Sequence, residues 1–128
     1  MSSIDKALGA IPAAAAVQAR RLEIVAGNIA NASTPNYKAR DLDFRQVMSA
    51  ITQPDAAPVG TPARAEQLQV LTSKALKYRV PLSASRDENT VESSVEEASY
   101  GDAATRYLAA LRFAESTLSG LRKAYRGD

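Results

Sequence analysis

Both ends of this chain carry apolar side chains at heptad spacing, and that pattern constrains the fold more than any other feature. Near the N-terminus, steps of four and three residues alternate through eight positions, of which seven are apolar: Ile4, Leu8, Ile11, Ala15, Gln18, Leu22, Val25 and Ile29. Near the C-terminus, the same steps connect Ala104, Tyr107, Leu111, Ala114, Leu118, Leu121 and Tyr125. Side chains spaced in this way share one helical face, and a sustained repeat is typical of coiled coils. We therefore predict a mainly α fold whose long N- and C-terminal helices form an antiparallel coiled-coil hairpin.

Proline and charge set the expected limits of these two helices. Pro12 suits the first turn of a helix better than its interior, so we predict an N-terminal helix from about Ile11 to Ala30 with a frayed lead-in. The C-terminal helix is expected from about Thr90 to Arg126. Its acidic residues gather at its start and its basic residues toward its end, as the helix dipole favours.

The segment between the helices, residues 31–89, contains five of the six prolines and few apolar side chains. In chain order we expect a short helix over residues 42–51 and a flexible loop over residues 50–65. Two short extended segments should follow, over residues 68–71 and 78–82. This loop-rich middle segment is too poor in apolar residues for a large core of its own, so we expect it to project from one end of the hairpin. The chain then divides into a terminal helical domain, residues 1–30 with 90–128, and the middle segment.

Two helices bury only one stripe each, and several apolar residues lie off the predicted seam. Val17, Ile24, Leu108 and Phe113 would stay exposed on a two-helix hairpin. Because an extensive apolar surface usually marks an association site, we expect neighbouring chains to complete the fold. The predicted interface residues are Leu8, Ile11, Leu22, Val25, Ile29, Tyr107, Leu111, Ala114, Leu118, Leu121 and Tyr125.

The composition argues against catalysis and against most metal sites. The chain has no cysteine and no histidine, so it lacks disulfides, thiolate nucleophiles, zinc-thiolate sites and the commonest general base. Asp41 and Asp43 could serve a histidine-free hydrolase or a cation, but no third acidic residue completes a calcium loop. A net charge of +2 gives little support for nucleic-acid binding through the basic C-terminal turn. We predict no catalytic, cofactor or metal site, and keep both alternatives as minor ones.

The most distinctive string is NIANASTPNYKARDLDF, residues 28–44. We expect Asn28 and Asn31 to close the N-terminal helix through short polar side chains. Thr34, Pro35, Asn36 and Tyr37 have the form of a type II turn, with proline second and a residue tolerant of positive φ third. From local chemistry alone, this string is a helix stop followed by a sharp turn.

The same string resembles the N-terminal signature of the rod and hook family of bacterial flagellar axial proteins. In that family an Asn-rich helix end leads into Thr-Pro-Gly-Tyr, and here Asn36 takes the place of the glycine. Residues 78–82, 89–91 and 106–123 are similar to the C-terminal region of proximal-rod members. Glu88 stands where those members usually carry glycine. The short middle segment disfavours the distal rod and hook proteins, and other proximal rod proteins remain an alternative.

The resemblance implies a structural subunit of the flagellar basal-body rod, a torque-transmitting shaft in the periplasm. It implies export through the flagellar type III apparatus without a cleaved signal peptide. The partners it implies are other copies of the chain, an adjacent rod protein such as FlgC, and the basal-body adaptor FliE. It implies no cofactor, no nucleic acid and no small-molecule substrate.

Overall fold

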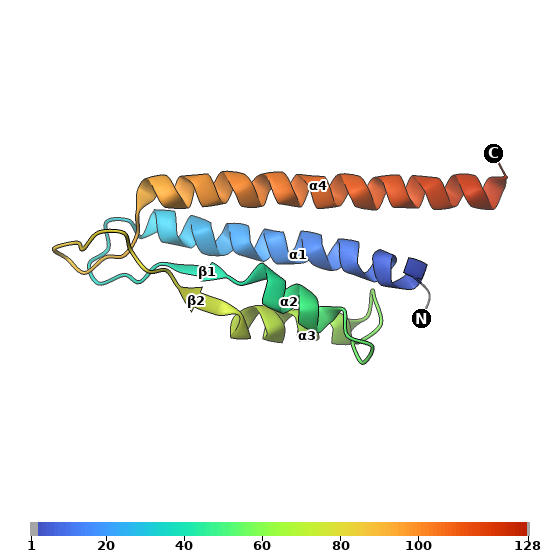
Figure 1. The fold of residues 1–128 in the computed structure, drawn as a ribbon, viewed down its shortest axis with the longest axis horizontal. Helices are drawn as coiled ribbons and strands as arrows, with labels where there is room; N and C mark the ends of the chain where they lie inside the picture. The colour runs from blue at the N-terminus through green and yellow to red at the C-terminus, as the bar shows by residue number, and fades with distance from the viewer. Residues whose placement is uncertain (1–2, 128) are drawn as a thin grey trace.

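The N-terminal helix lies between the C-terminal helix on one side and a layer of short elements on the other. The computed structural model describes residues 3–127, in which the regular elements are α1 (Ser3–Ala30), β1 (Arg40–Leu42), α2 (Phe44–Ile51), α3 (Pro62–Lys74), β2 (Leu76–Tyr78) and α4 (Ser93–Arg126). Figure 1 shows α1 and α4 side by side and running in opposite directions, with the short elements along the other side of α1. The prediction of a mainly α fold with long terminal helices is confirmed.

Both long helices end at their predicted last residues and α4 begins close to its predicted start, but α1 begins eight residues before its own. α1 starts at Ser3, before the predicted start near Ile11, and accommodates Pro12 inside the helix. α4 starts at Ser93 and ends where Gly127 adopts a left-handed conformation with φ of 74°. Glycine takes that conformation without the steric cost that a Cβ would impose. At 1.5 Å per residue, α4 is about 51 Å long, and in Figure 1 it extends past the start of α1.

The middle segment lies along α1, so the expectation that it projects from one end of the hairpin is wrong. Val17 of α1 is fully buried against Leu42, Val47 and Ala75. The partly buried side chains around this cluster are Ile24, Phe44, Met48, Leu68, Leu71 and Leu76. The short helices each turn apolar side chains toward α1. The core is therefore formed jointly by α1 and the middle segment. The off-seam residues of α1 are thus covered within the chain.

The second half of the middle segment is helical where we expected extended structure. Residues 68–71 belong to α3, whose N-cap is Thr61: its Oγ1 accepts a hydrogen bond from the Arg64 amide at 3.2 Å. Pro62 occupies the first helical position, where its missing N–H costs nothing. The second extended segment, residues 78–82, overlaps β2 only at Tyr78.

The first half of the middle segment agrees better with the prediction. The short helix expected over residues 42–51 is α2, and its N-cap Asp43 accepts a hydrogen bond from the Gln46 amide at 3.1 Å. β1 precedes α2 and pairs with β2 in an antiparallel two-stranded sheet, with Leu42 opposite Leu76. This small sheet lies beside α1 and leads the chain into and out of the α2–α3 pair.

Candidate functional site

The signature string forms a capped helix end followed by a tight turn. The Asn31 side chain donates to the Gly27 carbonyl at 2.8 Å and so caps α1. The Tyr37 amide donates to the Thr34 carbonyl at 3.3 Å, and Asn36 has a φ of 62°. These are the hydrogen bond and the positive φ that a type II turn requires, and this prediction is confirmed. Asparagine tolerates the left-handed region better than most residues.

The segment that leads into α4 fastens this turn. The buried Asn89 side chain donates to the carbonyls of Asn31, Ala32 and Thr34 at 2.8 to 3.0 Å. Its Oδ1 accepts from the Val91 amide at 2.7 Å. The Thr90 amide donates to the Tyr37 carbonyl at 3.0 Å. We call residues 31–37 with residues 87–91 the turn junction. It fixes the end of α1 to the start of α4, although the two are far apart in the sequence.

Glu88, at the edge of the turn junction, also has a positive φ, of 60°. A side chain costs roughly 1–2 kcal/mol in this region, which glycine avoids at a smaller entropic cost. We expect Glu88→Gly to raise the free energy of unfolding by about 1 kcal/mol, since its ion pair with Lys38 is exposed and 4.0 Å long. Chemical denaturation measures this. Ala84→Gly, in the same exposed loop and without a positive φ, should not stabilise the chain; equal gains in both variants would contradict the explanation.

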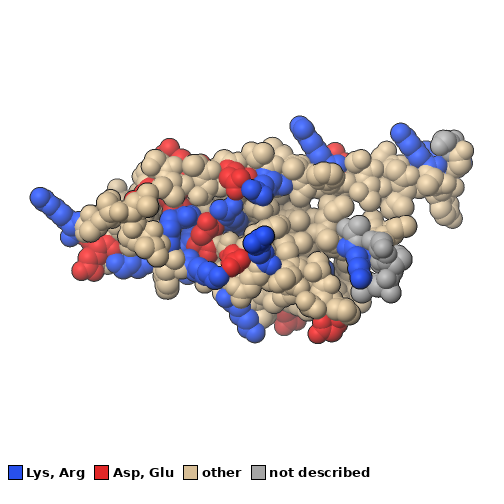
Figure 2. All heavy atoms as spheres, viewed as in Figure 1, with Lys and Arg blue, Asp and Glu red and all other residues tan. Residues whose placement is uncertain are grey.

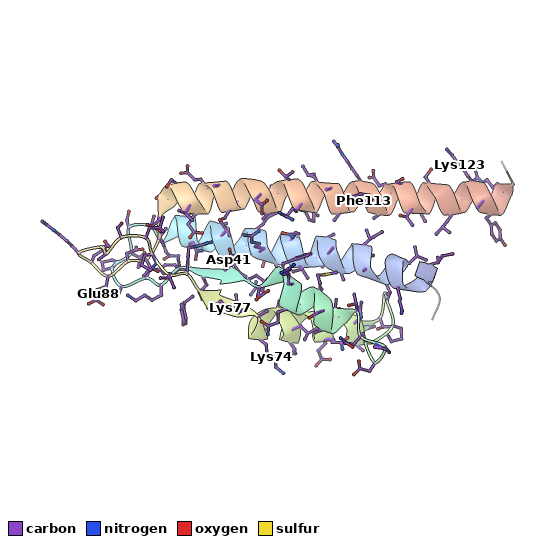
Figure 3. The ribbon with its side chains drawn as sticks, in the orientation of Figure 1. Asp41, Lys74, Lys77, Glu88, Phe113 and Lys123 are labelled. Carbon is purple, nitrogen blue, oxygen red and sulfur yellow. The ribbon has the colours of Figure 1, made fainter. Side chains whose placement is uncertain are left out.

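A network of charged side chains joins α1, the small sheet and α4. Arg21 on α1 binds Asp41 through two hydrogen bonds, at 2.9 and 3.1 Å, and Asp102 through one at 3.0 Å. Arg79, just after β2, donates to Asp41 at 3.0 Å and to Glu96 at 2.8 Å. We call this set the ionic network; its members are Arg21, Asp41, Arg79, Glu96, Asp102 and Arg106. Figure 2 shows acidic and basic side chains interleaved over this part of the molecule, and Figure 3 places Asp41 beside α1.

The buried end of the network contains a carboxylate and an amide. Glu96 and Asn28 are both fully buried. The Asn28 Nδ2 donates to Glu96 at 2.9 Å and to the Arg40 carbonyl at 2.7 Å, while its Oδ1 accepts from the Arg40 amide at 3.1 Å. Asn28 therefore does not bond the last carbonyls of α1, contrary to our expectation. It attaches β1 and α4 to the face of α1, and only Asn31 takes the capping role.

The arginines of the network shift the pKa values of its aspartates. Burial raises the pKa of Asp41, but hydrogen bonds from Arg21 and the Leu42 amide, with the charges of Arg21 and Arg79, outweigh it and lower the pKa below its usual value. Hydrogen bonds from Arg106 and then Arg21 lower the pKa of Asp102. The hydrogen bond to Asp41 raises the pKa of Arg21. The folded chain thus favours the charged forms of Arg21, Asp41 and Asp102.

These shifts predict the pH dependence of stability. A carboxylate with a lowered pKa stabilises the fold above its unfolded value, about 3.9 for aspartate, and loses that contribution as the pH falls through the folded value. The free energy of unfolding should therefore change little between about pH 8 and pH 5 and fall below about pH 4. Denaturation at a series of pH values measures it. Asp41→Asn should be less stable at neutral pH and less sensitive to acid; an unchanged acid limb would contradict the role of Asp41.

The two aspartates of the signature have structural partners. Asp41 belongs to the ionic network, and Asp43 caps α2 and binds Lys77 Nζ at 2.5 Å. In the part of the chain that the structure describes, no three acidic side chains converge as metal ligands would. Within residues 3–127, none of the helices is long and apolar enough to cross a membrane. Asp41 and Asp43 thus each hold neighbouring elements of the fold together through ion pairs.

The predicted interface residues fall into two groups. Those on α1 are packed within the chain: Val25 is buried, and Leu8, Ile11, Leu22 and Ile29 are half-buried. Those on α4 become more exposed toward its end. Tyr107 and Ala114 are half-buried, but Leu118 is 51% exposed and Tyr125 96%. Leu108 and Phe113, off the seam, are exposed at 56% and 66%. Residues 105–126, which we call the α4 arm, thus leave large apolar side chains largely exposed, although part of the arm lies beside α1, where Ala109 and Ala110 line a shared pocket with Ile11.

Two long antiparallel helices, held together at one end by the turn junction and the ionic network, make this an elongated, mainly helical protein whose α4 arm exposes apolar side chains. A family model described as "Flagella basal body rod protein" matches residues 13–38. The chain is 34% identical to the flagellar basal body rod protein FlgB of Aeromonas hydrophila, over 98% of this chain and 97% of that one. It is 34% identical to FlgB of Cereibacter sphaeroides, over all of both chains, and 33% to FlgB of Salmonella typhimurium, over 99% and 98%. The chain belongs to the FlgB family of flagellar basal body rod proteins.

Proposed function

We propose that the chain is a structural subunit of the proximal rod of the bacterial flagellum and helps to transmit torque. The observation that carries this proposal is the match to FlgB proteins along essentially their whole length. The structure supports it through the turn junction, which uses the signature residues to set the position of α4 against α1. A rod subunit needs such a fixed geometry and no catalytic step, and we propose that the chain is not an enzyme.

We infer that α1 and α4 form an antiparallel coiled-coil hairpin whose seam continues into neighbouring subunits. The heptad positions of α1 from Leu8 to Ile29 are buried or half-buried in the chain, whereas Leu118, Leu121 and Tyr125 of the α4 arm are exposed. Exposed apolar positions along one helical face are the usual sign of a missing partner helix. The interface residues predicted from the sequence are then divided between an internal half on α1 and an external half on the α4 arm.

The partners and the location of the chain follow from the same proposal. The neighbours would be other copies, an adjacent FlgC-like rod protein and the adaptor FliE, assembled in the periplasm. Export through the flagellar type III apparatus without a cleaved signal peptide would suit a chain that has no cysteine. An arm whose exposed side chains pack on neighbours would defer part of its ordering until assembly.

A deletion and complementation experiment tests the proposed function. Removing the gene should abolish swimming, and restoring it should return both swimming and a stoichiometric amount of the chain in purified basal bodies, measured by mass spectrometry. Normal swimming in the deletion strain, with basal bodies of normal length, would overturn the proposal. Salt-dependent binding of duplex DNA by the purified chain would instead favour the nucleic-acid alternative.

A further inference from the structure

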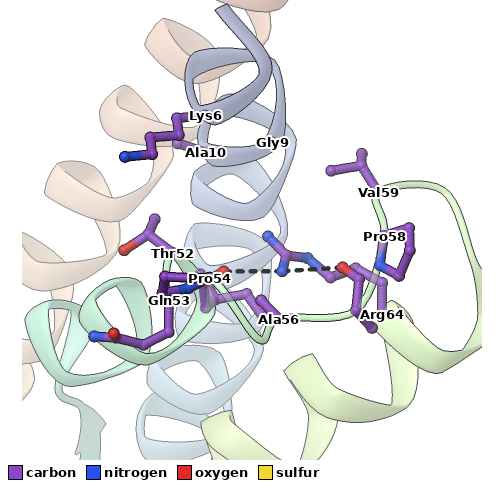
Figure 4. A pocket seen from close by; sticks show the side chains of 12 residues that line it. Lys6, Gly9, Ala10, Thr52, Gln53, Pro54, Ala56, Pro58, Val59 and Arg64 are labelled. Carbon is purple, nitrogen blue, oxygen red and sulfur yellow. Dashed lines mark hydrogen bonds between the residues drawn. The ribbon is translucent and has the colours of Figure 1, made fainter. Parts of the chain in front are cut away.

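One end of the molecule contains an apolar cavity. It has a volume of about 370 Å³ and lies between the start of α1 and the loop that joins α2 to α3 (Figure 4). Its apolar walls include Gly9, Ala10, Ile51, Pro54, Pro58 and Val59. The loop is held in place by α3: Arg64 Nη1 donates to the carbonyls of Ile51 and Ala57 at 2.8 and 3.3 Å, and Gln67 accepts from the Ala57 amide at 3.1 Å. We call this cavity the socket.

The socket is lined by two cations in addition to its apolar walls. Lys6 and Arg64 both line it. Among the described side chains, neither cation has a carboxylate partner within 4.0 Å. The acidic residues that form ion pairs there bind other lysines and arginines. An apolar cavity beside positive charge fits an apolar group that is flanked by acidic residues.

The opposite end of the molecule presents exposed apolar side chains close to acidic residues. Val80 and Leu82 are 86% and 87% exposed, more than the other large aliphatic side chains of the described core and surface. The segment between them is held at both ends, because the Arg79 amide donates to the Ala39 carbonyl at 2.9 Å and the Leu82 amide to the Glu92 carboxylate at 3.2 Å. We call residues 80–82 the plug.

The surroundings of the plug are mixed in charge with an acidic excess. The loop that follows it, residues 82–92, contains three acidic residues and Arg86. Lys38 lies near Glu88, with its Nζ 2.6 Å from the Glu88 carbonyl. Figures 1 and 3 show this loop, to which Glu88 belongs, at the far end of the molecule from the α2–α3 loop that forms the socket.

We propose that the plug of one copy inserts into the socket of the next copy. This inference rests on the proposed function, which places several copies in one rod. Plug and socket lie at opposite ends, so the contact is heterologous and repeats in one direction without requiring closure, as an open assembly needs. Asp87 and Glu88 of the first copy then approach Lys6 and Arg64 of the second. The contact covers the exposed aliphatic side chains of the plug with the apolar walls of the socket.

Disulfide cross-linking tests the contact directly, because the chain has no cysteine of its own. We expect a chain with Leu82→Cys and Val59→Cys to form cross-linked oligomers in basal bodies from swimming cells, seen as a reducible ladder on a gel. A matched pair, Leu82→Cys with Val70→Cys, places the second cysteine on the exposed side of α3 outside the socket and should form none. Assembled basal bodies in which the first pair gives no more cross-linking than the second would overturn the proposal.

A charge placed on the plug provides a second readout. Leu82→Asp should cause a loss of swimming, whereas Ser83→Asp, the same charge on the neighbouring exposed residue, should not; circular dichroism checks that both fold. If Leu82→Asp swims normally in a strain whose gene deletion is non-motile, the plug is wrong and the proposed function stands. A non-motile Leu82→Asp without cross-linking of the plug–socket pair also overturns this contact. A deletion strain that swims overturns the proposed function itself.

Discussion

Replacing Glu96 with alanine should destabilise the chain by about 3–5 kcal/mol, the usual cost of removing one partner from a buried ion pair. Glu96 is fully buried and binds both Arg79 and Asn28. Without it, the half-buried Arg79 guanidinium keeps only Asp41, and the Asn28 amide loses one of its acceptors. Most natural domains are stable by only about 5–15 kcal/mol, so this single change removes a large part of the total.

The neighbouring residue provides the control for this prediction. Glu97 lies next to Glu96 on α4 but is exposed, and Glu97→Ala should change the free energy of unfolding by no more than about 0.5 kcal/mol. Chemical denaturation of both variants measures the difference. Combining Glu96→Ala with Arg79→Ala should cost less than the sum of the single changes, because the two residues interact directly. Equal effects of Glu96→Ala and Glu97→Ala would show that the ionic network does not hold α4 in place.

Leu118→Asp should abolish swimming while leaving the isolated chain folded. Leu118 is 51% exposed on the α4 arm, at a heptad position of the predicted seam. A carboxylate there is tolerated in water, but it cannot be buried against a neighbouring helix without a large desolvation cost. The expected result is a strain that makes and exports the chain but assembles no rod, measured by swimming zones and by counting basal bodies in electron micrographs. Leu111→Asp, at another position of the seam, should have the same effect.

The control for the arm is again the adjacent residue. Ser119 is exposed and lies off the predicted seam, so Ser119→Asp introduces the same charge without changing a heptad position. Its strain should swim, and its melting temperature should match that of Leu118→Asp. Normal swimming by Leu118→Asp would remove the α4 arm from the interface. A loss of folding in Leu118→Asp would instead indicate that the arm packs on its own chain.

The parts of the fold predicted from sequence are those that depend on local chemistry. Heptad spacing located both long helices, and the Thr-Pro-Asn-Tyr string located the turn, because each reflects the conformation of a few consecutive residues. The prediction was wrong at α3, where we expected a loop and an extended segment, although Thr61 and Pro62 are a usual helix start. Three nearby prolines favour a loop there, and the short apolar run after these prolines predicts extended structure.

The ionic network and the turn junction depend on contacts that sequence spacing does not reveal. Asn28 and Glu96 are 68 residues apart, and Asn31 and Asn89 are 58 apart. Residue type alone does not distinguish a buried glutamate from an exposed one, and we assigned the acidic start of α4 to the helix dipole. A weak signal was present, because Glu96 shares a helical face with the buried Ala103 seven residues later.

Density for the assembled basal body would test most directly whether neighbouring subunits complete this fold. We expect each copy to keep the turn junction and the ionic network, with the α4 arm packed on adjacent subunits so that Leu118, Leu121 and Tyr125 are buried. An assembled rod in which these side chains face solvent would contradict that expectation.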